Sequence, residues 1–261
     1  MIQSFFLLLL PILPLPESPP AKKEPLSTSH TSSSRLLLKA HRYGKSSFSK
    51  RLIDSTKKSG RTAFDWLFWY AQWGENKILI DSGFTDEKYI KRYAMKDYQS
   101  PTQLLAKDGI SPNEITDVII THSHFDHIGG AHLFPNANIW IQRTEYKSFT
   151  RTSRYRSVKA FFDKAKTDGR LQLLDGDKEI LPGVEVRLTG GHTVGHQVVL
   201  IHDVITHVFV GDECYQDKLC RNRISLPAAS CYNMKRNRIF LKSLAELYKS
   251  GAQIHSLHQL E

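Results

Sequence analysis

The stretch THSHFDHIGG, residues 121–130, places three imidazoles and one carboxylate within six consecutive positions. It follows DVII at 117–120, a β-branched apolar run that predicts a short buried strand. In layered α/β folds, binding groups commonly follow the carboxyl ends of such strands. Side chains two positions apart in an extended chain point to the same side, so His122 and His124 can bind one ion together.

The remaining polar side chains of this stretch that can bind a metal are Asp126 and His127. We expect them after the turn that ends the strand, at the start of a helix, where they can face a second ion. Buried without a metal, such a group of polar side chains would cost several kcal/mol of desolvation. Imidazole and carboxylate are ligands that zinc prefers. The sequence therefore predicts one wall of a two-metal site.

The pattern His-x-His-x-Asp-His after an apolar strand resembles the signature of the metallo-β-lactamase superfamily. Further segments are similar to other parts of the family's pattern. Asp81, in KILIDSG at 77–83, looks like the carboxylate that supports the site from an upstream strand end. His192, in GGHTVGH at 190–196, looks like the third imidazole of the first metal. Asp212 after an apolar run looks like the bridging carboxylate, and His258 falls where the family has its last ligand.

The resemblance implies a complete ligand set. His122, His124 and His192 hold one ion, Asp126, His127 and His258 hold the other, and Asp212 bridges them. The cofactors are expected to be two Zn²⁺, although iron, manganese or cobalt also suit these ligands. In the implied mechanism a metal-bridging hydroxide attacks a carbonyl carbon. Asp126 and Tyr215 are the candidate catalytic residues, with Tyr215 donating a hydrogen bond to the carbonyl oxygen.

Within the superfamily, the chain resembles the N-acyl homoserine lactonases through IQRTEY at 141–146 and through Tyr215, three residues after Asp212. This resemblance implies an enzyme that opens the lactone ring of N-acyl homoserine lactones or of related lactones and esters, and so degrades bacterial quorum-sensing signals. The main alternative is a glyoxalase II-like thiolester hydrolase. A phosphodiesterase or nuclease, and a metal-binding protein without activity, are further alternatives.

One departure from the lactonase pattern affects the last ligand. Lactonases usually have Gly-His-Asp around it, whereas this chain has LHQ at 257–259. His255 lies close by in the sequence and is therefore an alternative to His258. The expected binding partner is a small lactone or ester, and the sequence leaves the oligomeric state open.

The resemblance implies an α+β fold, the four-layered αββα sandwich of the metallo-β-lactamase family. The apolar runs that predict strands lie at 36–40, 64–70, 77–80, 137–141, 171–174, 184–188, 197–201 and 206–210. Between the first two runs we expect a basic loop at 45–61. Ser100-Pro101-Thr102-Gln103 has the spacing of a capping box and predicts the start of a short helix. The stretch 234–249 predicts a terminal helix with Ile239, Phe240, Leu244, Leu247 and Tyr248 facing inward.

The first 34 residues differ in composition from the rest of the chain. FFLLLL at 5–10 is too short to span a bilayer, and the Pro, Ser and Thr content of 16–34 is typical of a linker. We expect residues 1–34 to be a signal-like apolar segment with a disordered linker, and 35–261 to form one metallo-β-lactamase-fold hydrolase domain. The segment favours export, to the periplasm or outside the cell, over a cytoplasmic location. No stable membrane span is expected.

The formal net charge of +10 would attract nucleic-acid phosphates. However, the basic residues are spread over the linker, 45–61, 145–170 and 221–242, and no recognised nucleic-acid-binding module is present. The charge therefore gives little support to a nucleic-acid partner. The helical and basic stretch 145–170 is either a lid over the site or a solvated helix face.

Two features leave alternatives open. An exported protein could pair Cys214 with Cys220 and leave Cys231 over, whereas a cytosolic protein would keep all three thiols reduced. The aromatic side chains that either line an acyl pocket or form ordinary core are Trp66, Phe68, Trp69 and Trp73.

Overall fold

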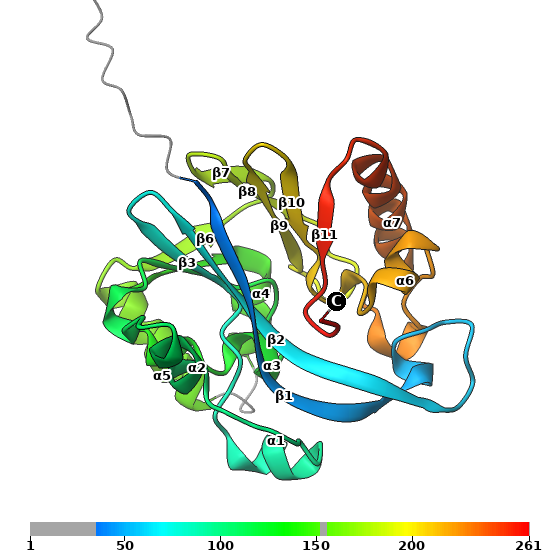
Figure 1. The fold of residues 1–261 in the computed structure, drawn as a ribbon, viewed down its shortest axis with the longest axis horizontal. Coiled ribbons are helices and arrows are strands. Elements are labelled where there is room, and N and C mark those ends of the chain that lie inside the picture. Colours follow the sequence, from blue (N-terminus) through cyan, green and yellow to red (C-terminus); the bar gives the residue numbers. More distant parts are fainter. Residues whose placement is uncertain (1–34, 152–155, 261) are drawn as a thin grey trace, which may run out of the picture. The chain divides into compact units, whose positions relative to one another are not determined.

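The computed structural model of this protein describes residues 35–151 and 156–260, so the predicted signal-like segment and linker lie outside the described residues. The described chain forms two β-sheets (Figure 1). The first sheet has the order β1-β2-β3-β4-β5-β6, with bounds Leu37–Ser49, Arg61–Trp73, Asn76–Ile80, Asp117–Ile119, Asn138–Gln142 and Leu171–Leu174. The second has the order β11-β10-β9-β8-β7, with bounds Gln253–His255, Thr206–Phe209, Gln197–His202, Val184–Leu188 and Lys178–Leu181.

The helices lie outside the sheets, with α2 and α5 beside the first sheet and α7 beside the second (Figure 1). The α-helix bounds are Glu87–Arg92 (α1), Pro101–Lys107 (α2), Phe125–Ile128 (α3), Arg143–Thr150 (α4), Arg156–Thr167 (α5), Asp217–Arg221 (α6) and Met234–Lys249 (α7). The capping box expected at Ser100 is present at the start of α2. None of the helices in the described ranges is long and apolar enough to cross a membrane.

Three clusters of buried apolar side chains hold the layers together. One lies between the sheets, and the other two lie between each sheet and its helices. Strand residues alternate between these clusters because successive side chains of a strand point to opposite faces. Ile119 and Val199 belong to the cluster between the sheets. Val118 of β4 shares a cluster with Phe162 of α5, and Leu200 of β9 shares one with Leu244 of α7. This arrangement confirms the predicted four-layered αββα sandwich.

The strand order places the site. β3, β4, β5 and β6 run parallel, so their carboxyl ends meet at one edge of the first sheet. Asp81 follows β3 and His122 follows β4 at this edge. In the second sheet, β10 and β11 also run parallel and lead to Asp212 and His258. Local sequence therefore forms the strands, but the pairing of parallel neighbours brings these residues together.

Two sequence-based expectations about the elements are wrong. The basic loop expected at 45–61 is shorter, because β1 runs to Ser49 and β2 begins at Arg61, so that only 50–60 connect the two strands. In α7, Ile239 is 57% exposed, whereas Leu241, not among the expected inward residues, is 1% exposed. A helical period places Leu241 on the face of Phe240 and Leu244, and turns Ile239 toward solvent.

We expect Gly130→Ala to destabilise the fold through a steric clash. A Cβ at Gly130 would lie 2.1 Å from the carbonyl oxygen of Ser82. Overpacking typically costs about 1–3 kcal/mol. The atom that the new Cβ meets is a backbone oxygen, which can move less than the end of a side chain. The free energy of unfolding measured in urea should therefore fall by about 3 kcal/mol.

Gly109→Ala is the matched control. Gly109 has φ +73° but nothing within 4 Å of a built Cβ, so its substitution tests left-handed strain alone, about 1–2 kcal/mol. A loss no larger for Gly130→Ala than for Gly109→Ala would contradict the close approach of the two loops.

Candidate metal centre

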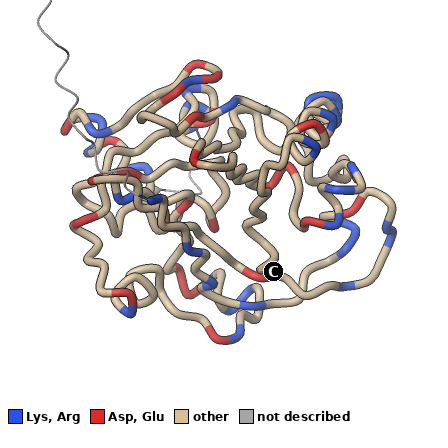
Figure 2. Tube along the Cα trace, turned by 45° about the horizontal axis from the view of Figure 1, so that its top comes forward, with Lys and Arg blue, Asp and Glu red and all other residues tan. Residues whose placement is uncertain are grey.

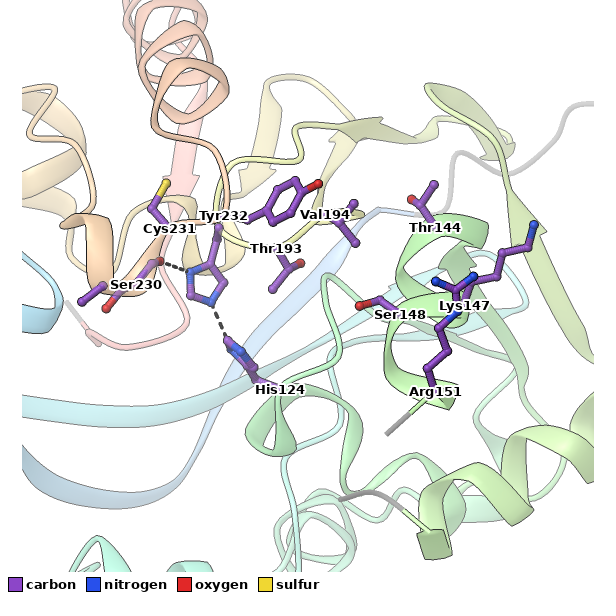
Figure 3. Close-up of a pocket in the computed structure, with 12 residues that line it drawn as sticks. His124, Thr144, Lys147, Ser148, Arg151, Thr193, Val194, Ser230, Cys231 and Tyr232 are labelled. Carbon is purple, nitrogen blue, oxygen red and sulfur yellow. Dashed lines mark hydrogen bonds between the residues drawn. The ribbon is translucent and has the colours of Figure 1, made fainter. Parts of the chain in front are cut away.

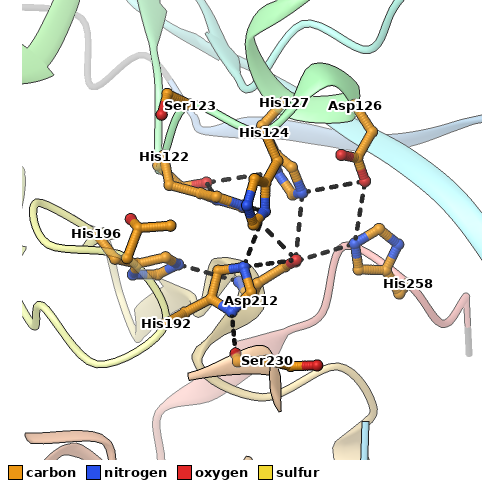
Figure 4. A network of polar contacts seen from close by, with 12 residues as sticks. His122, Ser123, His124, Asp126, His127, His192, His196, Asp212, Ser230 and His258 are labelled. Carbon is orange, nitrogen blue, oxygen red and sulfur yellow. Dashed lines mark hydrogen bonds and ion pairs between the residues drawn. The ribbon is translucent and has the colours of Figure 1, made fainter. Parts of the chain in front are cut away.

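The structure brings all of the predicted metal ligands into one cluster (Figure 4). They come from the segment after β4, from α3, from the loop between β8 and β9, and from the segments after β10 and β11. Within each of two groups, the potential ligand atoms lie within 4.8 Å of one another. One group is His122, His124, His192 and Asp212, and the other is Asp126, His127 and His258.

Three imidazole nitrogens converge in the first group. Nδ1 of His124 lies 3.0 Å from Nε2 of His122 and 3.0 Å from Nε2 of His192. Neighbouring ligands of a tetrahedral zinc ion with bonds of 2.0–2.1 Å lie about 3.3 Å apart, close to this spacing. Burial lowers the pKa of His122 well below its ordinary value and lowers that of His192 to about 3. Both imidazoles are therefore neutral near pH 7, with lone pairs available to a metal.

Asp212 faces both groups because its two carboxylate oxygens point in different directions. Oδ2 lies 3.4 Å from Nε2 of His192 and 3.6 Å from Nε2 of His122. Oδ1 lies 2.9 Å from Nε2 of His258 and 3.3 Å from Nε2 of His127. This is the arrangement that a bridging ligand requires.

Asp126 completes the second group. Its Oδ2 lies 3.3 Å from Nε2 of His127 and 3.7 Å from Nε2 of His258. The second group therefore offers a carboxylate and two imidazoles, with Asp212 as a shared fourth ligand.

Hydrogen bonds on the outer ring nitrogens orient three of the imidazoles. In each, Nδ1 faces an acceptor and Nε2 points into the cluster, which is the usual support of a metal-binding histidine. The acceptors are Ser230 O for His192 at 2.7 Å, Asp65 O for His258 at 3.1 Å, and Asp81 Oδ2 for His127 at 2.7 Å.

The charges around His127 fit a bound cation. Burial alone would lower the pKa of His127, but the carboxylates of Asp126, Asp212 and Asp81 together raise it well above its ordinary value. Its buried Nε2 lies 3.3 Å from an oxygen of Asp126 and from one of Asp212, but the angles do not suit a hydrogen bond to either. Buried carboxylates at such density need a compensating positive charge, and a divalent ion supplies one without leaving the nitrogen unpaired. The residues present therefore fit a divalent metal.

His258, and not His255, lies in the cluster. Nε2 of His255 lies 3.0 Å from Nδ1 of His207, and its ring packs against Trp69 with centroids 4.4 Å apart. The backbone N–H of His258 donates to Ser256 Oγ at 3.0 Å, which helps to hold the turn that follows β11. The geometry favours His258 as the last ligand despite the departure at 257–259.

Asp81 ties the first two ligand segments together. It accepts hydrogen bonds from the backbone N–H of Thr121 at 2.7 Å and from Thr121 Oγ1 at 2.8 Å, in addition to its contact with His127. Its φ of +60° is uncommon for a residue other than glycine, although aspartate tolerates it better than most. Residues held in such conformations cluster at functional sites.

The loops that carry the candidate ligands are held in position by two buried glutamates, which the sequence analysis did not identify. Glu145 Oε1 accepts from Ser123 N at 2.9 Å and from Ser123 Oγ, and Oε2 accepts from Thr193 Oγ1 and Gly195 N, both at 2.9 Å. It therefore joins the loop of His122 and His124 to the loop of His192. The segment 141–146 carries the lactonase resemblance, and this was the available signal for Glu145.

Glu213 and His196 support the bridge and the third imidazole. Glu213 Oε1 accepts from the backbone N–H groups of Gly191 at 2.7 Å and His192 at 3.1 Å. Nε2 of His196 accepts from the backbone N–H of Asp212 at 3.0 Å. Burial lowers the pKa of His196 to about 3, so it remains a neutral acceptor. The available sequence signals were that Glu213 adjoins Asp212 and that His196 ends the stretch GGHTVGH, which contains His192.

A hollow of about 380 Å³ opens onto the cluster, and we call it the aromatic hollow. Its aromatic lining is Phe48, Phe64, Trp66, Tyr89, Tyr93 and Phe125. Among the aromatic residues considered for an acyl pocket, only Trp66 lines it. Phe68 is buried in the core against α-helices, and Trp69 and Trp73 pack against the core between the sheets.

Tyr215 also lines the aromatic hollow. Its ring centroid lies 5.4 Å from that of His258 and 5.9 Å from that of His192. Burial and the negative charges of Asp212 and Asp126 raise the pKa of Tyr215 well above its ordinary value. The phenol therefore keeps its proton and can donate a hydrogen bond.

Cys214 and Cys220 form a disulfide behind the cluster, and Cys231 is free and half-buried. The Cα atoms of the pair are 5.6 Å apart, which is an ordinary separation for a disulfide. Cys214 packs in the core under α7 and is not among the two ligand groups.

Glu145→Gln should weaken metal binding without removing a ligand. The glutamine side chain has one oxygen that can accept, whereas the carboxylate has two. At least one pair of buried donors therefore loses its acceptor, and each unpaired buried donor costs about 1–3 kcal/mol. Loss of such support typically lowers metal affinity about 10–100-fold, and competition with a chelator would measure this. Glu179→Gln is the control, because Glu179 is exposed and, among the described residues, accepts a side-chain hydrogen bond from Gly183 N alone. Equal metal affinity in both variants would contradict the positioning role.

Residues 68–219 match the sequence model of the family described as "Metallo-beta-lactamase superfamily". Among curated proteins, the chain is similar to an N-acyl homoserine lactonase of Bacillus sp, with 30% identity over 126 residues that make up 48% of each protein. It is also 32% identical over 108 residues to a probable metallo-hydrolase of Methanocaldococcus jannaschii, 41% of each protein. The alignment thus spans about half the length of the curated lactonases.

Solved structures extend the likeness of fold. A quorum-quenching N-acyl homoserine lactone lactonase superposes with a TM-score of 0.71 at 23% identity, covering 85% of this chain and 91% of that one. The dizinc quorum-quenching lactonase AidC superposes with a TM-score of 0.66 at 19% identity, covering 86% and 87%. With the family match extending over more than half of its length, the chain belongs to the metallo-β-lactamase superfamily.

Proposed function

We propose that this protein is a hydrolase dependent on two divalent ions, zinc foremost, that opens the ring of N-acyl homoserine lactones or of related lactones and esters. The observation that carries the proposal is the placement of Asp212, whose two oxygens face two ligand groups beneath the aromatic hollow. Similarity to curated N-acyl homoserine lactonases supports the substrate class. The biological consequence would be the degradation of bacterial quorum-sensing signals.

Divalent ions held by these ligands would supply Lewis acidity toward a carbonyl oxygen and would make water easier to deprotonate. Tyr215 donates its phenolic hydrogen to the substrate oxygen on which negative charge grows. Burial would raise the pKa of Asp126, but His127 lowers it below its ordinary value, so Asp126 is ionised and can accept a proton from water. The walls of the aromatic hollow bind the acyl chain and exclude water.

A glyoxalase II-like thiolester hydrolase is the second candidate. The observation that favours it is a pair of cations, Lys147 and Arg151, beside a second hollow that reaches His124. A nuclease gains less support, because a nucleic acid needs an extended basic surface, and Figure 2 shows Lys and Arg interspersed with Asp and Glu around the described chain.

Lactone hydrolysis is tested with purified protein in a pH-indicator assay across N-butanoyl to N-dodecanoyl homoserine lactones. We expect turnover that a chelator abolishes and zinc restores. Tyr215→Phe should lower kcat by about a hundredfold at unchanged metal content, because it removes a donor to the developing charge. Turnover of S-lactoylglutathione without lactone turnover would select the second candidate. Bound metal without turnover of either substrate would contradict both.

The ligand assignment is tested by metal analysis of His258→Ala and His255→Ala. We expect close to two ions per chain in the natural protein and in His255→Ala, and about one in His258→Ala, because only His258 reaches Asp212 and Asp126. Circular dichroism checks that both variants fold. Loss of an ion from His255→Ala, or full retention by His258→Ala, would contradict the assignment.

A further inference from the structure

A second hollow, of about 720 Å³, lies beside the metal centre on the side of α4 (Figure 3). It shares four lining residues with the aromatic hollow, namely His124, His192, Ala229 and Ser230. The metal centre therefore lies where two hollows meet, each in the size range of small-molecule sites. A substrate that reacts there can extend into both.

The lining of the second hollow is positively charged, and we call it the basic hollow. Lys147 and Arg151 project from α4 on one side, opposite Ser230 and Tyr232 (Figure 3). No carboxylate is among the described residues that line it. The aromatic hollow has side chains of both signs in its lining, Lys88 and Arg92 as well as Asp126 and Asp212.

Lys147 and Arg151 differ from the basic residues near them in the fold. Arg143, Lys159 and Lys164 each form a salt bridge with a nearby aspartate. No salt bridge joins Lys147 or Arg151 to a carboxylate of the described chain, although Lys147 lies close enough to Asp175 to help lower the pKa of that carboxyl group. Because they are four positions apart near the end of α4, they point to the same side and repel each other.

The end of a helix offers a partial reason for this pair, since cations there interact favourably with the helix dipole. That interaction depends on closeness to the last turn and not on the direction of the side chain. It does not explain why both cations border a hollow that reaches two metal-ligand candidates. An anion placed between them would relieve their repulsion and form charge-assisted hydrogen bonds.

We propose that the basic hollow binds an anionic group of the substrate, a carboxylate or a phosphate, while the aromatic hollow binds an apolar part. The inference deepens the proposed function and rests on it. The preferred substrate is then an ester or thiolester with an anion at one end. In its hydrolysis the acyl carbon loses its bond to the leaving oxygen or sulfur, and water supplies hydroxyl to the acyl carbon and a proton to the leaving atom.

Two phenyl esters test the inference with the metal-replete protein. Phenyl hydrogen glutarate and phenyl pentanoate share the phenyl group and a similar chain length, but only the first ends in a carboxylate. We expect a lower KM for the glutarate ester. Lys147→Gln/Arg151→Gln should raise that KM about tenfold and leave the KM of the pentanoate ester unchanged. A phosphonate in place of the carboxylate distinguishes the two anions, and preference for either one supports the proposal.

Matched variants separate local binding from general attraction. Lys178→Gln/Lys242→Gln removes two charges from exposed positions that line neither hollow, and it should change neither KM. Lys88→Gln/Arg92→Gln removes the cations of the aromatic hollow. An equal KM increase in any of these variants, or no preference for the glutarate ester, would overturn the inference and leave the proposed hydrolase intact.

A binding measurement keeps the inference testable if neither ester is hydrolysed, which would count against the proposed function alone. N-phenylglutaramate, the amide analogue, is titrated by calorimetry beside N-phenylpentanamide. Tighter binding of the charged amide that is lost in Lys147→Gln/Arg151→Gln supports the anion site. Equal binding of both amides, with or without these cations, overturns it.

Discussion

The burial of negative charge among imidazoles is the constraint on which the site depends. Asp81, Asp126 and Asp212 are almost inaccessible to solvent and all act on the pKa of His127. Each needs partners, because an unpaired buried carboxylate would be costly. Thr121, His127 and His258 supply some of them. The remaining imbalance favours a bound cation, and so the same electrostatics that stabilise the folded cluster also select a metal.

The packing of the two sheets sets the distances within that cluster. Asp212 follows a strand of the second sheet, whereas His122 and His127 follow a strand of the first. The apolar core between the sheets is close-packed, and such cores deform little. A shift of one sheet against the other would move Asp212 relative to both ligand groups. Ions bound to both ligand groups would therefore couple metal affinity to inter-sheet packing, because a ligand that binds only the folded state stabilises it.

The candidate ligands could be predicted because local sequence places most of them just after strands, as with DVII before His122. The supports were less visible, because Glu145 and Glu213 act on segments distant in sequence and their roles arise only when the loops pack. The aromatic hollow shows the same limit. Phe48 reaches it because β1 continues through a stretch whose Ser and Lys content indicated a loop. The sequence of α7 alone did not show which of Ile239 and Leu241 is buried, because the buried face of a helix depends on what packs against it.

The basic hollow bears on which of the proposed substrates this site would hydrolyse most readily. Hydrolysis of a neutral lactone creates a carboxylate, so cations beside the metal centre would hold that product more tightly than its substrate. Product release limits many hydrolases, and such retention would slow each cycle. A substrate whose own anion binds Lys147 and Arg151 would keep these interactions before and after cleavage. The two cations would then bind substrate and product about equally well. The cations would then improve capture of the substrate with less added retention of the product, so among the proposed lactones and esters an anionic one would gain most from them.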